Sequence, residues 1–315
     1  MAPDVTIAKS AVSESSTLHP RNPHRGRYDF TALIKAQPEL ASFVIITPAG
    51  QQSIDFTDAT AVKVLNQALL AHHYKVKFWQ LPEGYLCPPV PGRADYVHYL
   101  ADLLDDGDVN AAQNSTAKSA IRLLDIGTGA NCIYPIIASQ TYGWQVTASD
   151  IDPVAVRAAK LIAESNPVMK KRVKVVLQTK PEQCFTGVIM PDQYFDLTMC
   201  NPPFYRSASE AAAVSTRKWQ KLGKQASGRN FAGQPHELFC NGGELAFISN
   251  MINESRDFRA QVNWFSSLVS QSSHLPELKA LLRKVQAARV QVIAMRQGQK
   301  TSHILAWSFQ SSGIK

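Results

Sequence analysis

The sequence is poor in cysteine and has no long apolar run, and each absence excludes a class of protein. Its five cysteines are widely spread among 315 residues and never form a Cys-x-x-Cys pair, so neither a disulfide framework nor a zinc site is indicated. No stretch approaches the ~18 apolar residues of a membrane-spanning helix. Residues 1–17 lack the apolar segment of a secretory signal. We therefore expect a cytoplasmic protein with no metal site and no membrane partner.

Acidic residues are in the minority. Lys and Arg total 33 while Asp and Glu total 25, and the formal net charge of +8 favours a polyanionic partner. The basic residues gather in three segments, 19–27, 170–174 and 206–230, each of which is also compatible with a solvated face. The third segment contains a single acid, Glu210, and six basic residues: Arg206, Arg217, Lys218, Lys221, Lys224 and Arg229.

The pattern along the chain divides it into three regions. Residues 1–17 are small and polar, which predicts a disordered tail. Residues 18–104 contain helical patterns at 33–40 and 59–73, and end in a proline-rich stretch, 87–92, that we interpret as a rigid, extended connector. Residues 105–315 begin with a polar linker at 105–119 and form the main domain, with residues 206–230 as a basic loop.

In the main domain, strand patterns alternate with helical ones. Strands are predicted at 121–125, 144–149, 173–177, 195–200 and 261–269, and helices at 132–140, from Asp152 as a cap with Pro153 at its first position, at 246–255 and at 275–286. Residues 290–295 and 304–309 flank a turn signal and predict a hairpin. The fold class is therefore α/β, Rossmann-like, with a mostly parallel sheet and an antiparallel C-terminal strand.

A glycine turn follows the first of these strands, in Asp125-Ile126-Gly127-Thr128-Gly129. Glycines let the backbone approach a ligand closely, although they also suit a plain tight turn. Asp150 ends the second strand, where a carboxylate can accept hydrogen bonds from two ribose hydroxyls. Because the sequence has no Gly-Lys-Ser/Thr phosphate motif, these residues predict an adenosine without phosphates, that of S-adenosylmethionine. Arg93 is a candidate partner for its carboxylate, although the local pattern is also that of a surface arginine.

Asn201-Pro202-Pro203-Phe204 ends the fourth strand and carries the most specific chemical signal. Two prolines cannot donate to a strand ladder, so they end the strand and fix the direction of its carbonyls. A planar amine such as that of adenine can donate to the Asn201 oxygen and a proline carbonyl while its ring stacks on Phe204. The same tetrapeptide suits an ordinary turn. It shares with the glycine turn and Asp150 a position at the carboxyl end of a strand, where open α/β sheets bind ligands.

Longer motifs resemble the RlmF-type bacterial 23S ribosomal RNA adenine-N6 methyltransferases, from about Leu18 to Phe309. The eukaryotic methyltransferase-like RNA adenine methylases are a more distant branch. The proline-rich block ending at Tyr96 is far more specific than the glycine turn. The motifs are Leu18-His19-Pro20-Arg21-Asn22-Pro23-His24, Arg27-Tyr28-Asp29, Leu86-Cys87-Pro88-Pro89-Val90-Pro91-Gly92-Arg93-Ala94-Asp95-Tyr96, Asp125-Ile126-Gly127-Thr128-Gly129-Ala130 with Cys132-Ile133-Tyr134-Pro135, and Cys200 with the tetrapeptide that follows it.

This resemblance implies a class I methyltransferase that uses S-adenosylmethionine to methylate one adenine of 23S rRNA, as naked RNA or in a large-subunit assembly intermediate. It implies that Arg93 contacts the carboxylate of the cofactor, and Asp150 stands where the distant branch has a glutamate for the ribose. Asp125, Gly127 and Gly129 also belong to the expected cofactor site, and another contact is expected from near Gln178 to Lys180, with no residue assigned. The expected acceptor site is Asn201, Pro202, Pro203 and Phe204, the basic loop faces the RNA, and we expect a monomer.

Two alternatives are open at this point. Another amine-bearing acceptor is possible, since methylases of other RNAs, of DNA adenine and of protein glutamine also use Asn-Pro-Pro-aromatic sites. A non-catalytic RNA-binding or ribosome-assembly protein is the alternative from a different class. The intact tetrapeptide Asn201–Phe204 and Asp150 argue against it.

The basic loop generates a first prediction. Replacing Arg217, Lys218 and Lys221 with neutral residues should lower RNA affinity and make its dependence on salt less steep, because fewer counterions are released on binding. The measurement is the slope of log K against log salt concentration. An unchanged slope would remove these residues from the RNA interface.

Overall fold

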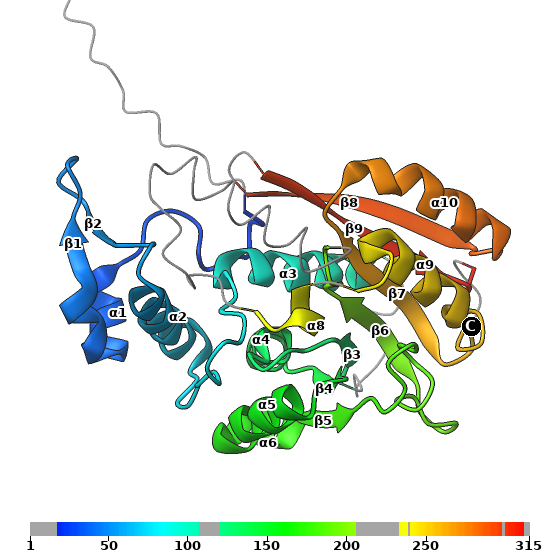
Figure 1. The fold of residues 1–315 in the computed structure, drawn as a ribbon, viewed down its shortest axis with the longest axis horizontal. Helices are drawn as coiled ribbons and strands as arrows, with labels where there is room; N and C mark the ends of the chain where they lie inside the picture. The colour runs from blue at the N-terminus through cyan, green and yellow to red at the C-terminus, as the bar shows by residue number, and fades with distance from the viewer. Residues whose placement is uncertain (1–17, 107–119, 206–232, 239, 298–299, 312–315) are drawn as a thin grey trace, which may run out of the picture.

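The computed structural model describes residues 18–106, 120–205, 233–238, 240–297 and 300–311. The expected N-terminal tail, most of the 105–119 linker and all six basic residues of the 206–230 loop lie outside these ranges. Figure 1 shows the arrangement of the described elements. A seven-stranded sheet forms the centre, with α1, α2 and a small two-stranded sheet toward one end of the molecule and α9 and α10 toward the other.

The central sheet has the strand order β5-β4-β3-β6-β7-β9-β8. The first five strands in this order run parallel, and β9 pairs antiparallel with both β7 and β8, which confirms the predicted mostly parallel sheet with an antiparallel C-terminal hairpin. The strand bounds are β3 Arg122–Ile126, β4 Gln145–Asp150, β5 Val173–Leu177, β6 Phe195–Cys200, β7 Val262–Val269, β8 Arg289–Gln297 and β9 Lys300–Ser308.

Helices cover both faces of this sheet, because its strands are apolar on both sides. Successive residues of β3 show this: Leu123 is buried with α3, α4, α5 and α6, while Leu124 is buried with α9 and α10. Asp152 caps α5 as predicted, accepting hydrogen bonds from the amides of Val154 and Ala155. The helix bounds are α3 Val90–Asp106, α4 Ile133–Ile137, α5 Pro153–Ser165, α6 Pro167–Arg172, α8 Pro235–Leu238, α9 Gly243–Ser255 and α10 Leu275–Lys284.

The N-terminal region is helical but differs from the prediction at its end. Helices α1 (Phe30–Ala36) and α2 (Ala59–Tyr74) and strands β1 (Val44–Ile46) and β2 (Gln52–Ile54) precede a non-helical stretch over residues 75–89. The extended connector does not reach Gly92, because α3 begins at Val90. Pro91 lies in the first turn of α3. Amides in the first turn of a helix have no intrahelical partner, so the missing amide hydrogen of proline costs no hydrogen bond there.

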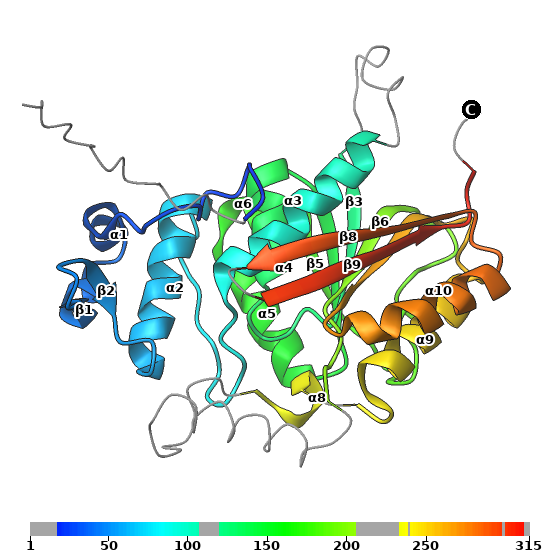
Figure 2. The ribbon, with the colours of Figure 1, turned by 90° about the horizontal axis from the view of Figure 1, so that it is seen from above.

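Helix α3 belongs to the core of the sheet as much as to the N-terminal region. It lies beside α4 and β8 (Figure 2). Ala94, Val97 and Leu100 of α3 are fully buried in the cluster that also contains Leu123 of β3. The hydroxyl of Tyr96 bonds Ser266 of β7 at 2.8 Å. The core is therefore continuous across residue 104, and a division of the chain there stays a prediction.

The first described residues bind to α3 through polar contacts. The backbone amide of His19 donates to Asp95 at 3.0 Å, and the Asn22 amide donates to the Pro91 carbonyl at 2.8 Å. Arg21 forms an ion pair with Asp102. The motif that begins at Leu18 thus fastens the N-terminal segment to α3, and part of its positive charge is already paired within the protein.

Buried histidines at this contact predict sensitivity to acid. Burial lowers the pKa of His24 to about 3 and that of His98 to about 4, and each ring leaves one nitrogen without a hydrogen bond among the described residues. The unfolded chain takes up these protons below about pH 6.5 while the folded chain does not. Stability should therefore fall as the pH drops from about 6.5 toward 4, by at most ~1.4 kcal/mol per group per pH unit.

Urea unfolding at pH 7.5, 6 and 5 measures this effect. His98→Gln retains a polar partner for the Tyr142 hydroxyl, which lies 2.6 Å from His98 Nδ1, but cannot gain a proton. Its stability should depend less on pH than that of the wild type. Equal pH dependence in the two proteins would show that His98 contributes nothing to it.

Candidate active site

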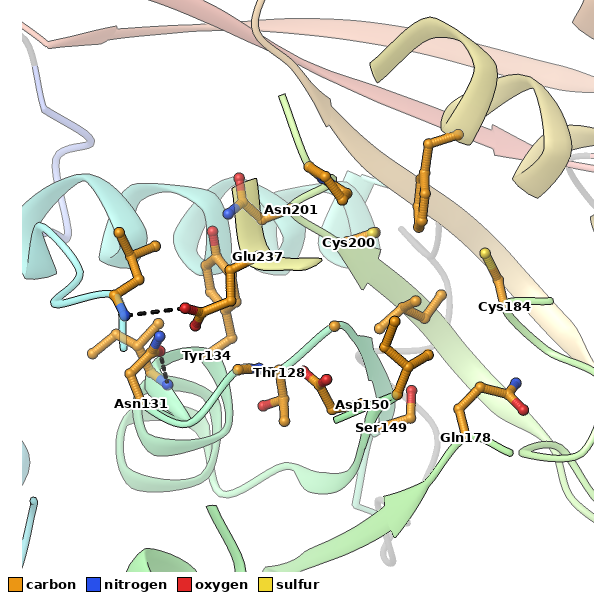
Figure 3. A pocket seen from close by; sticks show the side chains of 18 of the residues that line it. Thr128, Asn131, Tyr134, Ser149, Asp150, Gln178, Cys184, Cys200, Asn201 and Glu237 are labelled. Carbon is orange, nitrogen blue, oxygen red and sulfur yellow. Dashed lines mark hydrogen bonds between the residues drawn. The ribbon is translucent and has the colours of Figure 1, made fainter. Parts of the chain in front are cut away.

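The candidate site is a cavity at the carboxyl ends of β3, β4 and β6. The parallel register pairs Ile126 with both Ser149 and Cys200, so the three strands end at one level. The segments that follow them line the cavity together with residues from α4 and α8, as Figure 3 shows. Arg93 of α3 also lines it. The lining residues that the sequence predicted are Arg93, Gly127, Gly129, Asp150, Asn201 and Pro203.

The glycine turn after β3 forms the floor of the cavity. Gly127 and Gly129 have φ angles of +71° and +64°, values that favour glycine. The amides of Gly127 and Thr128 both donate to the Ser149 carbonyl, at 2.9 and 3.0 Å. A Cβ on Gly127 would meet no atom within 4 Å and would project into open space. The turn therefore leaves its backbone accessible to a ligand.

Asp150 lies beside this turn and holds it in place. Its carboxylate accepts a hydrogen bond from the Gly129 amide at 2.8 Å through one oxygen and from the Asp152 amide at 2.9 Å through the other. The side chain is only 6% exposed, yet it lines the cavity. A carboxylate at the cavity is a suitable acceptor for hydroxyl groups of a ligand.

Asp125, unlike the other predicted cofactor residues, lies beneath the cavity and does not line it. It is completely buried, and its oxygens have no partner at hydrogen-bond geometry in the described part of the chain. Burial raises the pKa of Asp125 to about 7, and the nearby charge of Asp150 acts in the same direction, while Thr128 and Arg93 oppose the shift. Direct contact between Asp125 and a cofactor stays a prediction.

Arg93 reaches the site from the first turn of α3. Its guanidinium donates to the Tyr134 hydroxyl at 3.1 Å and lies 5.8 Å from the centre of that ring. Arg93 forms no ion pair with a carboxylate of the described residues. A cation held by a neutral phenol retains donors for an anionic ligand group. The structure thus places Arg93 at the cavity rather than on an unrelated surface.

Asn201 stands between this cavity and a second one. Both cavities are lined by Arg93 and Asn201, and Phe204 lines the second, together with Asp95 and Met295. The Asn201 Oδ1 atom is buried and has no hydrogen-bond partner among the residues described. An orphaned buried acceptor costs free energy unless a ligand supplies its donor. Asn201 can therefore accept a hydrogen bond from a ligand in either cavity.

The backbone after Asn201 is fixed on both sides. Pro202 is buried, and the amides of Phe204 and Tyr205 both donate to the Leu238 carbonyl, at 3.1 and 3.0 Å. Before it, the Tyr96 hydroxyl lies 3.4 Å from the Cys200 amide nitrogen. The tetrapeptide is therefore preorganised by contacts with α3 and α8.

Several lining residues were not named by the prediction, although Gln178 lies in the stretch 178–180 near which another cofactor contact was expected. Glu237 of α8 accepts hydrogen bonds from the amides of Leu86 and Gln234, at 3.2 and 2.8 Å, and joins two distant segments at the cavity. Gln178, after β5, accepts from the Lys180 amide at 2.8 Å and donates to the Thr186 carbonyl at 3.0 Å. Neither residue belongs to a local motif, so their positions depend on long-range contacts that sequence spacing does not reveal.

Other site types find no support in the described ranges. They contain no group of three or more His, Cys, Asp or Glu placed to hold a metal ion. All five cysteines are free. No helix within the described ranges has the length and apolar character needed to cross a membrane.

A Rossmann-like sheet, a glycine turn after its first strand, an acid ending the second and Asn-Pro-Pro-Phe after β6 define a class I methyltransferase. Comparison with known proteins agrees: residues 12–311 match a family described as RNA methyltransferase. The chain belongs to this RNA methyltransferase family.

Relatives and solved structures resemble the chain over nearly its full length. Ribosomal RNA large subunit methyltransferase F of Psychrobacter sp. (strain PRwf-1) is 52% identical over 312 residues, which cover 94% of each chain. The protein of the same name from Desulfotalea psychrophila is 51% identical over 301 residues, covering 94% of this chain and 96% of the relative.

Two solved structures show the same fold. The hMettl16 catalytic domain in complex with the MAT2A 3′UTR hairpin 1 has a TM-score of 0.77 and 28% identity, over 95% of this chain and 99% of the other. The N-terminal domain of human METTL16 in complex with SAH has a TM-score of 0.73 and 27% identity, over 93% and 99%.

The buried carboxyl group beneath the cavity generates a prediction. In the unfolded chain Asp125 ionises near pH 3.8, but in the folded chain only near pH 7, so the folded state is penalised increasingly as the pH rises between these values. Asp125→Asn removes that charge. The variant should gain stability relative to the wild type from pH 4 to 7 and keep the gain above pH 7, on the order of 1–4 kcal/mol.

Denaturant unfolding of ligand-free protein at pH 5, 6, 7 and 8 provides the measurement. Asp196→Asn is a control, because Asp196 is only partly buried and lies at the other end of its strand. A stability difference for Asp125→Asn that does not change with pH would contradict the assigned titration.

Proposed function

We propose that the protein transfers a methyl group from S-adenosylmethionine to the exocyclic N6 amine of one adenine in 23S ribosomal RNA. The single observation that carries the chemistry is the buried Asn201 Oδ1 between two cavities, which lacks a donor in the described residues. The relatives named ribosomal RNA large subunit methyltransferase F support the choice of RNA. Cytoplasmic location and a monomeric state stay predictions from the sequence.

The first cavity fits the methyl donor. The donor carries an activated methyl group on a positively charged sulfur. Arg93 would bind the carboxylate of its methionine part, and the Asp150 carboxylate would accept hydrogen bonds from ribose hydroxyls. The open space above Gly127 lets the chain backbone approach the ligand. Gln178 and Cys184, near the opposite end of the cavity from Asn201 in Figure 3, would enclose the adenine of the donor.

The second cavity fits the acceptor base. Phe204 offers a ring on which a flipped adenine can stack, a contact worth ~1–3 kcal/mol that offsets part of the cost of unstacking the base. The amine would then donate one hydrogen to Asn201 Oδ1 and the other to the Pro202 carbonyl. Both acceptors are held in place before the base arrives, because α3 and α8 fix the backbone on either side.

Hydrogen bonding would then favour the transition state over the bound substrate. The lone pair of the adenine amine is delocalised into its ring, so the nitrogen must become pyramidal before it can attack. Positive charge develops on the nitrogen as it attacks, and the hydrogen bonds to Asn201 and Pro202 strengthen at that moment. The nitrogen–carbon bond would form as the sulfur–carbon bond breaks, and the donor would leave with a neutral sulfur. The methylated nitrogen would then be strongly acidic and would lose its extra proton to water, so no strong base is needed. The remaining contribution of the chain is to hold the nitrogen in line with the methyl group.

RNA contacts outside the acceptor site are also proposals. The six basic residues of the 206–230 loop, which lie outside the described ranges, would bind phosphates and bring the target base to Phe204.

The direct test of this function is methyl transfer from labelled S-adenosylmethionine to 23S rRNA that lacks the modification. We expect label in the RNA, recovered as N6-methyladenosine after digestion. Label found instead in DNA, protein or another RNA would show that 23S rRNA is not the acceptor and would identify the true one. RNA binding with no label anywhere would favour a non-catalytic assembly factor.

Asn201→Ala tests the residue on which the proposal depends. Loss of the acceptor oxygen should lower kcat by about 10²–10³-fold, with a smaller change in donor affinity, because the hydrogen bond is strongest in the transition state. Asn201→Asp keeps an acceptor oxygen at the same place and should retain more activity than Asn201→Ala. Equal losses in both variants, or a kcat unchanged by Asn201→Ala, would contradict the role of Oδ1.

A further inference from the structure

A second basic cluster, at residues 170–174, has no part in the proposed reaction. The structure shows that it does not stand alone. Residues from α6 and from the starts of β3, β4, β5 and β6 surround a groove at the amino-terminal edge of the sheet, the edge opposite the active site. Helix α6 packs against β5, the edge strand (Figure 1). The basic residues of the groove are Arg122, Lys170, Lys171, Arg172 and Lys174.

The groove is positively charged without compensation. Its lining contains five basic side chains and no acidic one. Lys170, Lys171 and Lys174 are exposed and form no ion pair within the described residues, while Arg172 donates to the Gly143 carbonyl. Asp196 lies nearby and accepts a hydrogen bond from the Arg122 amide at 2.7 Å. The lining itself therefore carries a clear excess of positive charge.

The shape of the groove distinguishes it from a scattered set of surface lysines. Three lysines from two elements, α6 and β5, approach it together with Arg122 from β3. Polar side chains of Gln145, Thr147, Gln193 and Tyr194 complete the lining. A concave surface that combines cations with neutral hydrogen-bonding groups suits a phosphodiester backbone, since most protein contacts to nucleic acid go to phosphate and sugar.

The groove is too far from the active site to contact the target nucleotide. Strand β3 has five residues and β6 has six, and a strand rises about 3.3 Å per residue. The two edges of the sheet are therefore on the order of 17–20 Å apart. Any RNA that reaches both must be long enough to pass around the protein, as a ribosomal RNA is.

We propose that this groove, formed by Arg122, Lys170, Lys171, Arg172 and Lys174, binds the phosphate backbone of a substrate RNA segment distant from the methylated base. The inference rests on the proposed function, in that the substrate is a long ribosomal RNA. The contact is independent of base sequence, because lysine and arginine recognise phosphates as charges. It contributes affinity and orientation but takes no part in methyl transfer.

The test is charge reversal in the full chain. Lys170→Glu, Lys171→Glu and Lys174→Glu together should weaken binding to a 23S rRNA transcript by about 10–100-fold at low salt and reduce the slope of log K against log salt by about 2–3. The same variant should bind a fragment trimmed to the target stem-loop as tightly as the wild type does. It should also keep its affinity for S-adenosylmethionine and its kcat on that fragment.

A matched control separates a local contact from the effect of net charge. The control variant carries Lys279→Glu, Arg283→Glu and Lys284→Glu in α10. Two of these residues lie in the last turn of α10, just as Lys170 and Lys171 lie in the last turn of α6. Either triple variant takes the formal net charge from +8 to +2. If both lower the affinity for long RNA equally, the groove has no specific role and the proposal is wrong.

Failure of this inference can be told apart from failure of the proposed function. Binding and its salt dependence are measured without turnover, so the groove is tested even if no adenine is methylated. Methylation by the wild type with unchanged long-RNA binding by the groove variant overturns the groove and leaves the function intact. If the groove variant lost affinity only for particles that contain ribosomal proteins, the groove would bind an acidic protein rather than RNA, and the proposal would be wrong.

Discussion

The parallel pairing of β3 with its two neighbours is the constraint on which the site depends. Because Ile126 is paired with Ser149 on one side and with Cys200 on the other, the residues that follow each strand leave the sheet at the same level. Gly127, Asp150 and Asn201 meet for that reason, although 74 residues separate the first from the last. A shift of one residue in either pairing would exchange the faces of a strand and move its buried side chains to the wrong side.

Further hydrogen bonds convert this alignment into a defined cavity. The Ser149 carbonyl accepts from two amides of the glycine turn, and Asp150 accepts from a third. Tyr96 of α3 bonds to both β6 and β7. These bonds join the sheet to a helix far earlier in the chain, and Arg93 reaches the cavity because it lies one turn before Tyr96. The positions of these site residues therefore depend on the pairing of the strands and on the buried Tyr96.

Much of the fold could be predicted from local patterns. The bounds of β5 and β6 agree with the prediction, β7 begins one residue later than predicted, and β3 and β4 are each shifted by one residue, because short apolar runs bounded by turn residues are clear signals. Helix α3 was not predicted at all. Prolines at 88, 89 and 91 suggested an extended chain, whereas a proline in the first turn is compatible with a helix, and burial of the apolar face of α3 decided the outcome.

The site could be predicted where its residues lie at the carboxyl end of a strand or in a long motif. Arg93, Gly127, Asp150 and Asn201 line the cavity as expected, but Asp125 is one strand residue too early and lies in the core. Glu237 is held at the site by hydrogen bonds that it accepts from the amides of two segments about 150 residues apart. No rule based on spacing in the sequence predicts such contacts. The basic residues at 170–174 were visible in the sequence, yet only the sheet topology shows which edge they occupy.

The wall shared by the two cavities has a thermodynamic consequence. Arg93 and Asn201 border both compartments, so a ligand that displaces either side chain in one compartment changes the surface met by a ligand in the other. Binding in the two compartments is then coupled, and the coupling is reciprocal: whatever factor one ligand applies to the affinity of its neighbour, the neighbour applies in return. Under the proposed function, Arg93 and Asn201 would therefore make the binding of donor and acceptor interdependent.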